Sequence, residues 1–436
     1  MEVFLIKALQ LILCLSILVI VHECGHFLFA KVFKVRVEKF YLFFNPWFSL
    51  FKFKPKNSET EYGLGWLPFG GYVKIAGMID ESMDKETLKQ PAQPWEFRTK
   101  PAWQRLLIMV GGVLMNFLLA FFIYSMIVAA WGDNYIPIKQ TPLYFSETAH
   151  KAGFEDGDQI QAADGKYLTR YDDLDLFRVI DARIVSVIRN GKKIVFDLPH
   201  DFKMQFMASK MPFADIAPAA IDSVVSGSRA EQAGLLTGDT IIAAAGVKTS
   251  AFGILSSVLS KHKDEVVELT IIRDSSTLQV LTHVDEKGKI GIAGKPRSLI
   301  TVSDQYSFFK SFPAGIKLGV RKLSFYVLQL KLMFSKAGIQ NIGGFGAIGK
   351  LFPDTWDWGA FWALTALFSI MLGVMNLLPI PALDGGHVLF LLYEVVTGRQ
   401  PSIKFLEYAQ YIGMLILIAL LIYANGMDVI RAFFSK

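Results

Sequence analysis

The residues with the clearest chemistry are His22, Glu23 and His26, which form a His-Glu-x-x-His sequence. Positions four apart on an α-helix lie on one face, so both imidazoles can bind one Zn²⁺. The glutamate then lies beside the metal, where it can take a proton from a bound water molecule. This pattern predicts a zinc centre that hydrolyses peptide bonds, with two histidine ligands and Glu23 as the catalytic base.

The segment around these residues, 8–30, is long and apolar enough to cross a membrane. Apart from Cys14 and Cys24, its ionisable side chains are the three residues of the motif. The two cysteines are about 15 Å apart along one helix, too far for a disulfide. Ionisable groups in hydrocarbon cost about 2.5–3.5 kcal/mol each on insertion scales, so their presence indicates function. We therefore expect hydrolysis within the membrane.

A third metal ligand is expected after His-Glu-x-x-His, and Asp384 is the best-placed carboxylate. It follows a long apolar run and lies among two prolines and two glycines that break the helix. Three protein ligands leave a fourth position for water, as in catalytic zinc sites. The alternative for Asp384 is a helix cap or an interface residue. His387 is a competing ligand, although its spacing from Asp384 favours a structural role.

Asn376 lies two helical turns before Asp384, inside the same apolar run. Its amide is expected either to hydrogen-bond the substrate backbone and steady an oxyanion, or to pack between helices.

Composition and charge indicate a membrane protein: the chain is 52% hydrophobic, contains 36 Phe and carries a net charge of +6. Four spans are expected, at 8–30, 106–131, 359–383 and 408–427. The weak positive charge suits membrane lipid, and no motif indicates nucleic-acid binding. Basic residues follow the first span and lie between the third and fourth, which places both regions in the cytoplasm. The two histidines and Asp384 are then expected at a similar, cytoplasmic level.

Two further segments beside the spans have a recognisable pattern. The glycine-rich segment 62–78 predicts a hairpin or re-entrant β-structure. Its edge would bind an unwound substrate through Gly70, Gly71, Tyr72 and Val73; a cytoplasmic hairpin without substrate contact is the alternative. The basic segment 310–336 predicts an amphipathic helix, either on the outer membrane surface or packed against the protein itself.

A repeat with a constant offset of 81 residues occupies the polar middle of the chain. Ala152-Gly153, Gly157-Asp158 and Ile160 return as Ala233-Gly234, Gly238-Asp239 and Ile241. The pattern resembles PDZ domains, which typically capture extended peptides by strand addition. We expect two such domains, at 133–215 and 216–298, that act either by peptide binding or sterically.

Together these features resemble the site-2 protease family of intramembrane zinc metalloproteases, of the bacterial regulator-of-sigma-E protease type. The resemblance rests on the motif at 22–26, the glycine-rich segment, the paired PDZ pattern and the N-x-x-P-x-P-x-L-D-G sequence at 376–385. It implies His22, His26 and Asp384 as Zn²⁺ ligands and Asn376 as a substrate contact. One departure is visible, because the Gly-Pro-x-x-Asn sequence often found in span two reads Gly112-Val113-Leu-Met-Asn116 here.

The resemblance also implies substrates and a location. The substrates would be single-pass membrane proteins, namely an anti-sigma factor already trimmed by a site-1 protease, and remnant signal peptides. The PDZ pair would exclude untrimmed substrates by size. The protein would lie in the bacterial inner membrane, with periplasmic PDZ domains and its active site toward the cytoplasm.

The expected fold class is therefore a polytopic α-helical membrane protein with four transmembrane helices and a re-entrant β segment, plus two extracytoplasmic α+β PDZ domains. The expected domains are 1–132, 133–215, 216–298 and 299–436. Two other functions compete: a catalytically inactive PDZ-bearing membrane scaffold and a metal transporter. The intact Glu23 argues against the scaffold, and the clustering of polar groups at one depth argues against the transporter.

Overall fold

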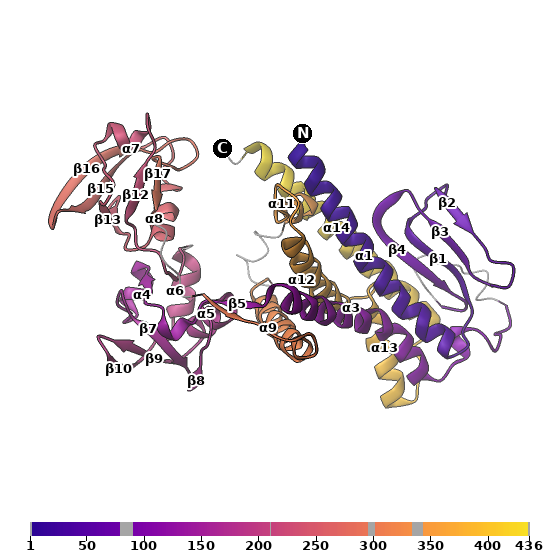
Figure 1. The fold of residues 1–436 in the computed structure, drawn as a ribbon. Coiled ribbons are helices and arrows are strands. Elements are labelled where there is room, and N and C mark those ends of the chain that lie inside the picture. Colours follow the sequence, from indigo (N-terminus) through magenta and orange to yellow (C-terminus); the bar gives the residue numbers. More distant parts are fainter. Residues whose placement is uncertain (1, 79–89, 210, 295–300, 334–342, 435–436) are drawn as a thin grey trace. The chain divides into compact units, whose positions relative to one another are not determined.

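The computed structural model describes residues 2–78, 90–209, 211–294, 301–333 and 343–434. It divides into two compact units, which Figure 1 shows as ribbons. The membrane unit combines the chain up to Gly132 with the chain from Gln305 onward, and the inserted unit is Asp133–Asp304. The chain thus leaves the membrane unit, forms the inserted unit and returns. The predicted boundary at 298/299 lies outside the described residues.

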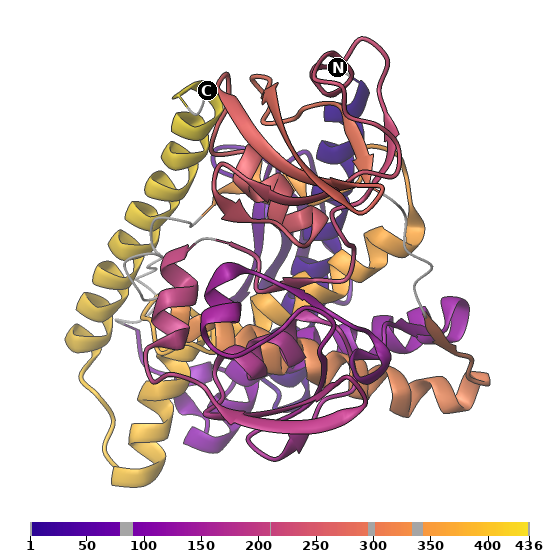
Figure 2. The ribbon, with the colours of Figure 1, turned by 90° about the vertical axis from the view of Figure 1, so that its left-hand side faces the viewer.

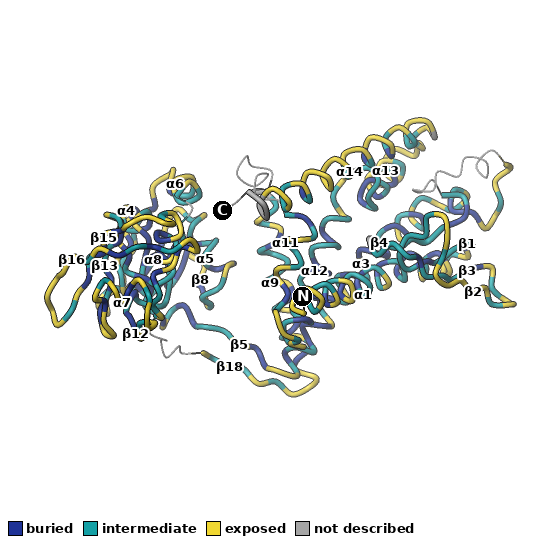
Figure 3. Tube along the Cα trace, turned by 90° about the horizontal axis from the view of Figure 1, so that it is seen from above, coloured by how far each residue is buried: buried dark blue, intermediate teal, exposed yellow. Residues whose placement is uncertain are grey.

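Among the described residues, four helices are long and apolar enough to cross a membrane, as predicted. They are α1 (Glu2–Val32), α3 (Ala102–Trp131), α12 (Trp358–Leu377) and the 404–430 part of α14 (Ile403–Phe434). Helix α3 packs against both α1 and α12. Helix α14, yellow in Figure 2, is largely exposed along its length, as Figure 3 shows. Exposed leucine and isoleucine side chains on these helices suit contact with lipid.

The third span ends earlier than predicted. Helix α12 stops at Leu377, not at residue 383, and a new helix, α13 (Asp384–Thr397), begins at Asp384. Pro379 and Pro381 account for the break, because proline lacks a backbone N–H and disfavours a helical conformation at the residue before it. Asp384 consequently belongs to the first turn of α13 rather than to the end of a membrane span.

A four-stranded sheet follows α1 in the sequence. Its strands β1 (Val37–Phe44), β2 (Phe51–Phe53), β3 (Glu61–Leu64) and β4 (Leu67–Ile75) lie in the order β2-β3-β1-β4. The expected β-structure at 62–78 is confirmed. A simple hairpin is wrong, because β1 lies between β3 and β4, parallel to the first and antiparallel to the second. Strand β4 is therefore at an edge of the sheet, and it contacts α1.

The predicted amphipathic segment forms α9 (Phe308–Met333), which packs against α3. Gly315 lies so close to Ser125 that a Cβ there would be 2.3 Å from its Cα atom. Ser125 Oγ also donates to the Phe312 carbonyl, at 3.3 Å. This face of the helix packs on the protein itself, and residues 334–336 lie outside the described residues. A short helix, α11 (Phe345–Lys350), precedes α12.

The sequence repeat of the inserted unit is also a structural repeat. Strand β7 (Gln159–Ala163) corresponds to β13 (Thr240–Ala244), and the two sheets have the matching orders β10-β9-β7-β8 and β16-β15-β13-β14. The other strands of these sheets are β8 (Lys166–Tyr167), β9 (Ile184–Arg189), β10 (Lys192–Asp197), β14 (Val247–Lys248), β15 (Val266–Arg273) and β16 (Ser276–His283). The helices are α4 (Glu147–Lys151), α5 (Asp173–Ile180) and α6 (Phe202–Ser209) in the first repeat, and α7 (Arg229–Gln232) and α8 (Phe252–Leu259) in the second.

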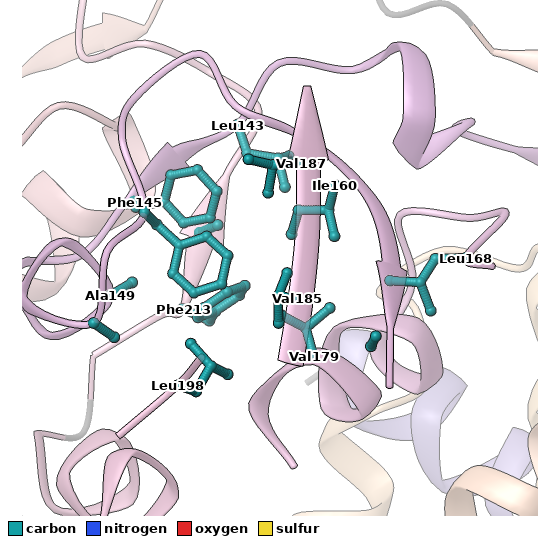
Figure 4. Close-up of a cluster of buried hydrophobic side chains, with 14 of the residues drawn as sticks. Leu143, Phe145, Ala149, Ile160, Leu168, Val179, Val185, Val187, Leu198 and Phe213 are labelled. Carbon is teal, nitrogen blue, oxygen red and sulfur yellow. The ribbon is translucent and has the colours of Figure 1, made fainter. Parts of the chain in front are cut away.

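Each repeat has its own apolar core and the same buried ion pair. Figure 4 shows the first core, in which Phe145 and Phe213 face strand residues such as Ile160. The aspartate of each Gly-Asp pair is buried and pairs with an arginine, Asp158 with Arg189 and Asp239 with Arg273, both at 2.7 Å. The Gly-Asp signal in the sequence thus marks a turn whose aspartate is ion-paired with a residue of β9 in the first repeat and of β15 in the second.

Candidate metal centre

Two helices bring the predicted ligands together. His22 and His26 lie on one face of α1, are almost fully buried, and have their Nε2 atoms 3.2 Å apart. Asp384, at the start of α13, places Oδ2 3.1 Å from Nε2 of His22 and 3.3 Å from Nε2 of His26. The three atoms form a nearly equilateral triangle. Ligand atoms about 2.0–2.1 Å from a tetrahedral zinc would lie roughly 3.3 Å from one another, so the triangle fits such an ion.

The hydrogen bond of His26 fixes which of its nitrogens can bind metal. Its Nδ1 lies 2.9 Å from the Ile108 carbonyl oxygen of α3. A carbonyl can only accept, so Nδ1 carries the proton and the lone pair of Nε2 faces Asp384. Metal-binding histidines usually have such a partner at the second ring nitrogen. The histidine is therefore oriented for a metal before one binds.

His22 has an equivalent partner in Asn116 of α3. The amide Nδ2 of Asn116 lies 3.1 Å from Nδ1 of His22, while its buried Oδ1 has no hydrogen-bond partner among the described residues. Exchange of the amide oxygen and nitrogen lets Oδ1 accept from Nδ1–H and leaves Nε2 of His22 free to bind metal. Asn116 belongs to the Gly-Val-Leu-Met-Asn sequence at 112–116, which by itself predicted no role for it.

Glycines let α1 and α3 approach closely enough for these contacts. A Cβ on Gly25 would lie 2.2 Å from the Gly111 carbonyl oxygen, so a side chain there would separate the helices. A Cβ on Gly112 would lie 2.4 Å from Nε2 of His26 and 2.6 Å from Cε1 of His22. The Gly112 backbone therefore lies in direct contact with both imidazoles. Its spacing from Asn116, four residues on along α3, was the only signal of it in the sequence.

The ligand triangle opens into a cavity of about 560 Å³. Glu23 lines it, interacts electrostatically with both histidines and accepts a hydrogen bond from the Val73 backbone of β4. All the predicted substrate-binding residues line the same cavity, namely Gly70, Gly71, Tyr72, Val73 and Asn376. The Asn376 amide nitrogen lies 3.3 Å from Nε2 of His22. The structure thus brings every residue predicted for the site to one place.

The competing ligand candidate His387 and a residue without a predicted role, Gln410, also surround this cavity. His387, one turn after Asp384 on α13, is part of the lining, as is Gln410 of α14. Farther along α13, Glu394 forms a buried ion pair with Arg105 of α3. This pair fastens the helix that carries Asp384 to the helix that supports the histidines.

Comparison with known proteins identifies the family. The model of peptidase family M50 matches residues 10–420, nearly the whole chain. The chain belongs to peptidase family M50. A Vibrio cholerae protein, named as a candidate zinc metalloprotease, is 30% identical over 457 residues, which cover 96% of this chain and 97% of that protein. The regulator of sigma E protease of Haemophilus influenzae is 27% identical over 96% of this chain and 98% of its own length.

A third relative, the regulator of sigma-E protease RseP of Escherichia coli, is also 27% identical, over 96% of this chain and 97% of its own. As a member of family M50, the site-2 protease family, the chain is a zinc metalloprotease of regulated intramembrane proteolysis, with Zn²⁺ as its cofactor. The four candidate membrane helices among the described residues, together with these relatives, indicate an inner-membrane protein, which also contains β-sheets. Membership of a metalloprotease family excludes the scaffold and transporter alternatives.

Proposed function

We propose that this M50 protease cuts peptide bonds within the transmembrane segments of single-pass membrane proteins, with His22, His26 and Asp384 as the zinc ligands. The observation that carries this proposal is the triangle of donor atoms, 3.1–3.3 Å on each side, buried between α1, α3 and α13. Two neutral imidazoles and one carboxylate are a donor set that zinc favours, and they leave a fourth position open.

Glu23 is the general base in this proposal. Zinc held by His22, His26 and Asp384 would supply a Lewis acid for the scissile carbonyl and for the attacking water. Glu23 would accept a proton at its carboxylate and deliver it to the leaving amide nitrogen. Its carboxylate is held at the cavity wall by the Val73 backbone, on the side where β4 runs past α1. The Ile108 carbonyl and Asn116 keep both imidazoles in the orientation that faces the metal.

The edge of β4 is proposed to hold the substrate. A helical substrate must unwind before a protease can reach its backbone, and the freed N–H and C=O groups then need partners within the membrane. Strand β4 pairs with β1 on one side, so its other edge can add a substrate strand along Gly70–Val73. Gly71 also lets β4 lie close to α1, since a Cβ there would be 2.7 Å from the Val19 side chain.

Asn376 is proposed to contact the substrate beside the metal. Its amide reaches the cavity from the last turn of α12 and lies next to His22. A donor at that position can hydrogen-bond the scissile carbonyl or the oxyanion that forms from it.

The two repeats of the inserted unit are proposed to be PDZ domains, at 133–215 and 216–298, on the periplasmic side. Support comes from the matching sheet orders and from the Gly-Asp turns. They would exclude substrates with large periplasmic parts and admit an anti-sigma factor trimmed by a site-1 protease, or remnant signal peptides. The names of the Haemophilus and Escherichia relatives support the first substrate class. The active site would lie toward the cytoplasmic side.

The test uses purified full-length protein with a model single-pass substrate, and measures cleavage together with zinc content. We expect Glu23→Gln to keep zinc without cleaving, and Asp384→Asn to lose both zinc and cleavage. Asp354→Asn removes an acid that is 70% exposed and pairs with Lys7, so it serves as the matched control. Wild-type levels of zinc in Asp384→Asn, or full cleavage by Glu23→Gln, would contradict the assigned roles.

A further inference from the structure

The turn that delivers Asp384 to the metal site contains a strained residue. Between the end of α12 and the start of α13, Ala382 has a φ of +75°. Side chains with a Cβ rarely occupy this left-handed region, and such a conformation persists only where the surrounding structure imposes it. Ala382 lies two residues before Asp384, so whatever holds it also helps to set the position of the carboxylate.

Helix α14 provides this restraint at two adjacent points. Gln410 Oε1 accepts a hydrogen bond from the Ala382 backbone N–H, at 3.2 Å. One turn of helix farther on, Gly413 lies against the turn so closely that a Cβ would be 1.8 Å from the Pro381 carbonyl oxygen. Gln410 is only 6% exposed, although α14 is largely exposed (Figure 3). A buried polar side chain on a lipid-facing helix indicates a specific role.

The restrained turn is packed directly onto the start of α13. A Cβ on Gly385 would lie 2.1 Å from the Leu378 carbonyl oxygen, and one on Gly386 would lie 2.7 Å from that of Ile380. The Gly386 N–H also donates to the Leu383 carbonyl, at 3.0 Å. With so little space between them, a shift of the turn moves Asp384 with it.

We infer that Gln410 and Gly413 are positioning residues of the metal centre: they hold the 378–383 turn so that Asp384 meets the two histidines. Helix α14 is then part of the metal site although it contributes no ligand. The inference rests on the proposed role of Asp384 as a zinc ligand. A purely structural Gln410 would affect the stability of the helix packing but not the geometry around the metal.

The test compares Gln410→Met with Ile412→Met in full-length protein. Both introduce methionine on α14, but Ile412 is 58% exposed and outside the cavity lining. We measure zinc release to a chelator and the visible absorption spectrum of the Co²⁺-substituted protein. Loss of the acceptor should speed zinc release about tenfold, as for other residues that orient metal ligands, and alter the Co²⁺ spectrum. Ile412→Met should match wild type.

Two more variants complete the series. Gln410→Glu keeps an oxygen acceptor beside Ala382 and should restore slow zinc release. Gly413→Ala should speed release at least as much as Gln410→Met; if it does not fold, the Gln410 pair decides. Zinc release and a Co²⁺ spectrum in Gln410→Met like those of wild type, or equal acceleration in Ile412→Met, would overturn the inference. Retention of zinc by Asp384→Asn would instead overturn the proposed function.

Discussion

The substitution Gly112→Ala tests the proposed metal site, because Gly112 lies against both histidines. The new Cβ would lie 2.4 Å from Nε2 of His26 and 2.6 Å from Cε1 of His22. Ordinary van der Waals contact begins at 3.4 Å, so the rings or the helices must separate by about 1 Å. One methyl group therefore acts on both histidines at once.

Neither histidine can move away from Gly112 without losing the contact at its Nδ1 atom. His26 is held by the Ile108 carbonyl at 2.9 Å, and His22 lies 3.1 Å from the Asn116 amide. A misplacement of about 1 Å at a reacting centre can reduce the rate about 100-fold, which corresponds to about 2.7 kcal/mol. Displaced ligands should also weaken zinc binding by about 10- to 100-fold.

The assay measures zinc content, zinc affinity and cleavage of a single-pass substrate by the purified protein. Gly426→Ala is the matched control, because Gly426 is also in a membrane helix and a Cβ there meets nothing within 4 Å. That change should keep activity and stabilise α14 by up to about 1 kcal/mol, as alanine favours the helix.

A Gly112→Ala protein with the zinc affinity and cleavage rate of wild type would refute this reasoning. Such a result would mean that α1 and α3 can move apart without disturbing the ligand triangle. The close packing at Gly25 and Gly111 argues against this freedom.

Three further predictions concern the ion pairs. Arg273→Met removes the cation that pairs with the Asp239 carboxylate and should destabilise the inserted unit, seen as faster hydrogen exchange in β13 and β15. Burial alone would raise the pKa of Asp239, but the hydrogen bonds from Arg273 and from the Leu236 N–H, together with the charge of Arg273, outweigh burial, and the pKa lies below its ordinary value. This carboxylate therefore stabilises the unit above the ordinary aspartate pKa, and the contribution should disappear as pH falls through the lowered value; acid titration of the exchange rates checks the sign. Arg105→Met leaves Glu394 buried without its cation and should lower the thermal stability of the membrane unit by about 3–5 kcal/mol, together with its zinc content, whereas unchanged values would exclude a role in fastening α13.

Several features of this protein could be predicted from the sequence because they depend on neighbours along the chain. The spacing of His22 and His26 places both on one helical face whatever the rest of the fold does. Membrane spans follow from the hydropathy of about twenty consecutive residues. The repeat in the inserted unit was visible because both copies keep the Gly-Asp turn, whose aspartate is buried against an arginine in each.

Other features were decided by contacts between distant parts of the chain. Asp384 was expected at the end of a membrane span, and it instead begins α13 after a turn that prolines create. Segment 62–78 was expected to form a hairpin or a re-entrant β-structure. Its strands β3 and β4 do not form a hairpin, because β1 lies between them, and strand order depends on which edges meet in three dimensions.

In the metal site, too, some features depend on neighbouring residues in the sequence and others depend on distant contacts. The His-Glu-x-x-His sequence was sufficient to predict the proposed chemistry, because ligand type and helical spacing are local properties. Gly112 and Asn116 meet the two histidines only because α3 packs against α1, and Gln410 meets Ala382 only because α14 contacts the turn before Asp384. For a glycine, an asparagine or a glutamine in an apolar run, the neighbouring sequence does not predict which residue it will contact. The packing of helices far apart in the sequence decides which atoms it touches, and thereby how the proposed zinc ligands are held.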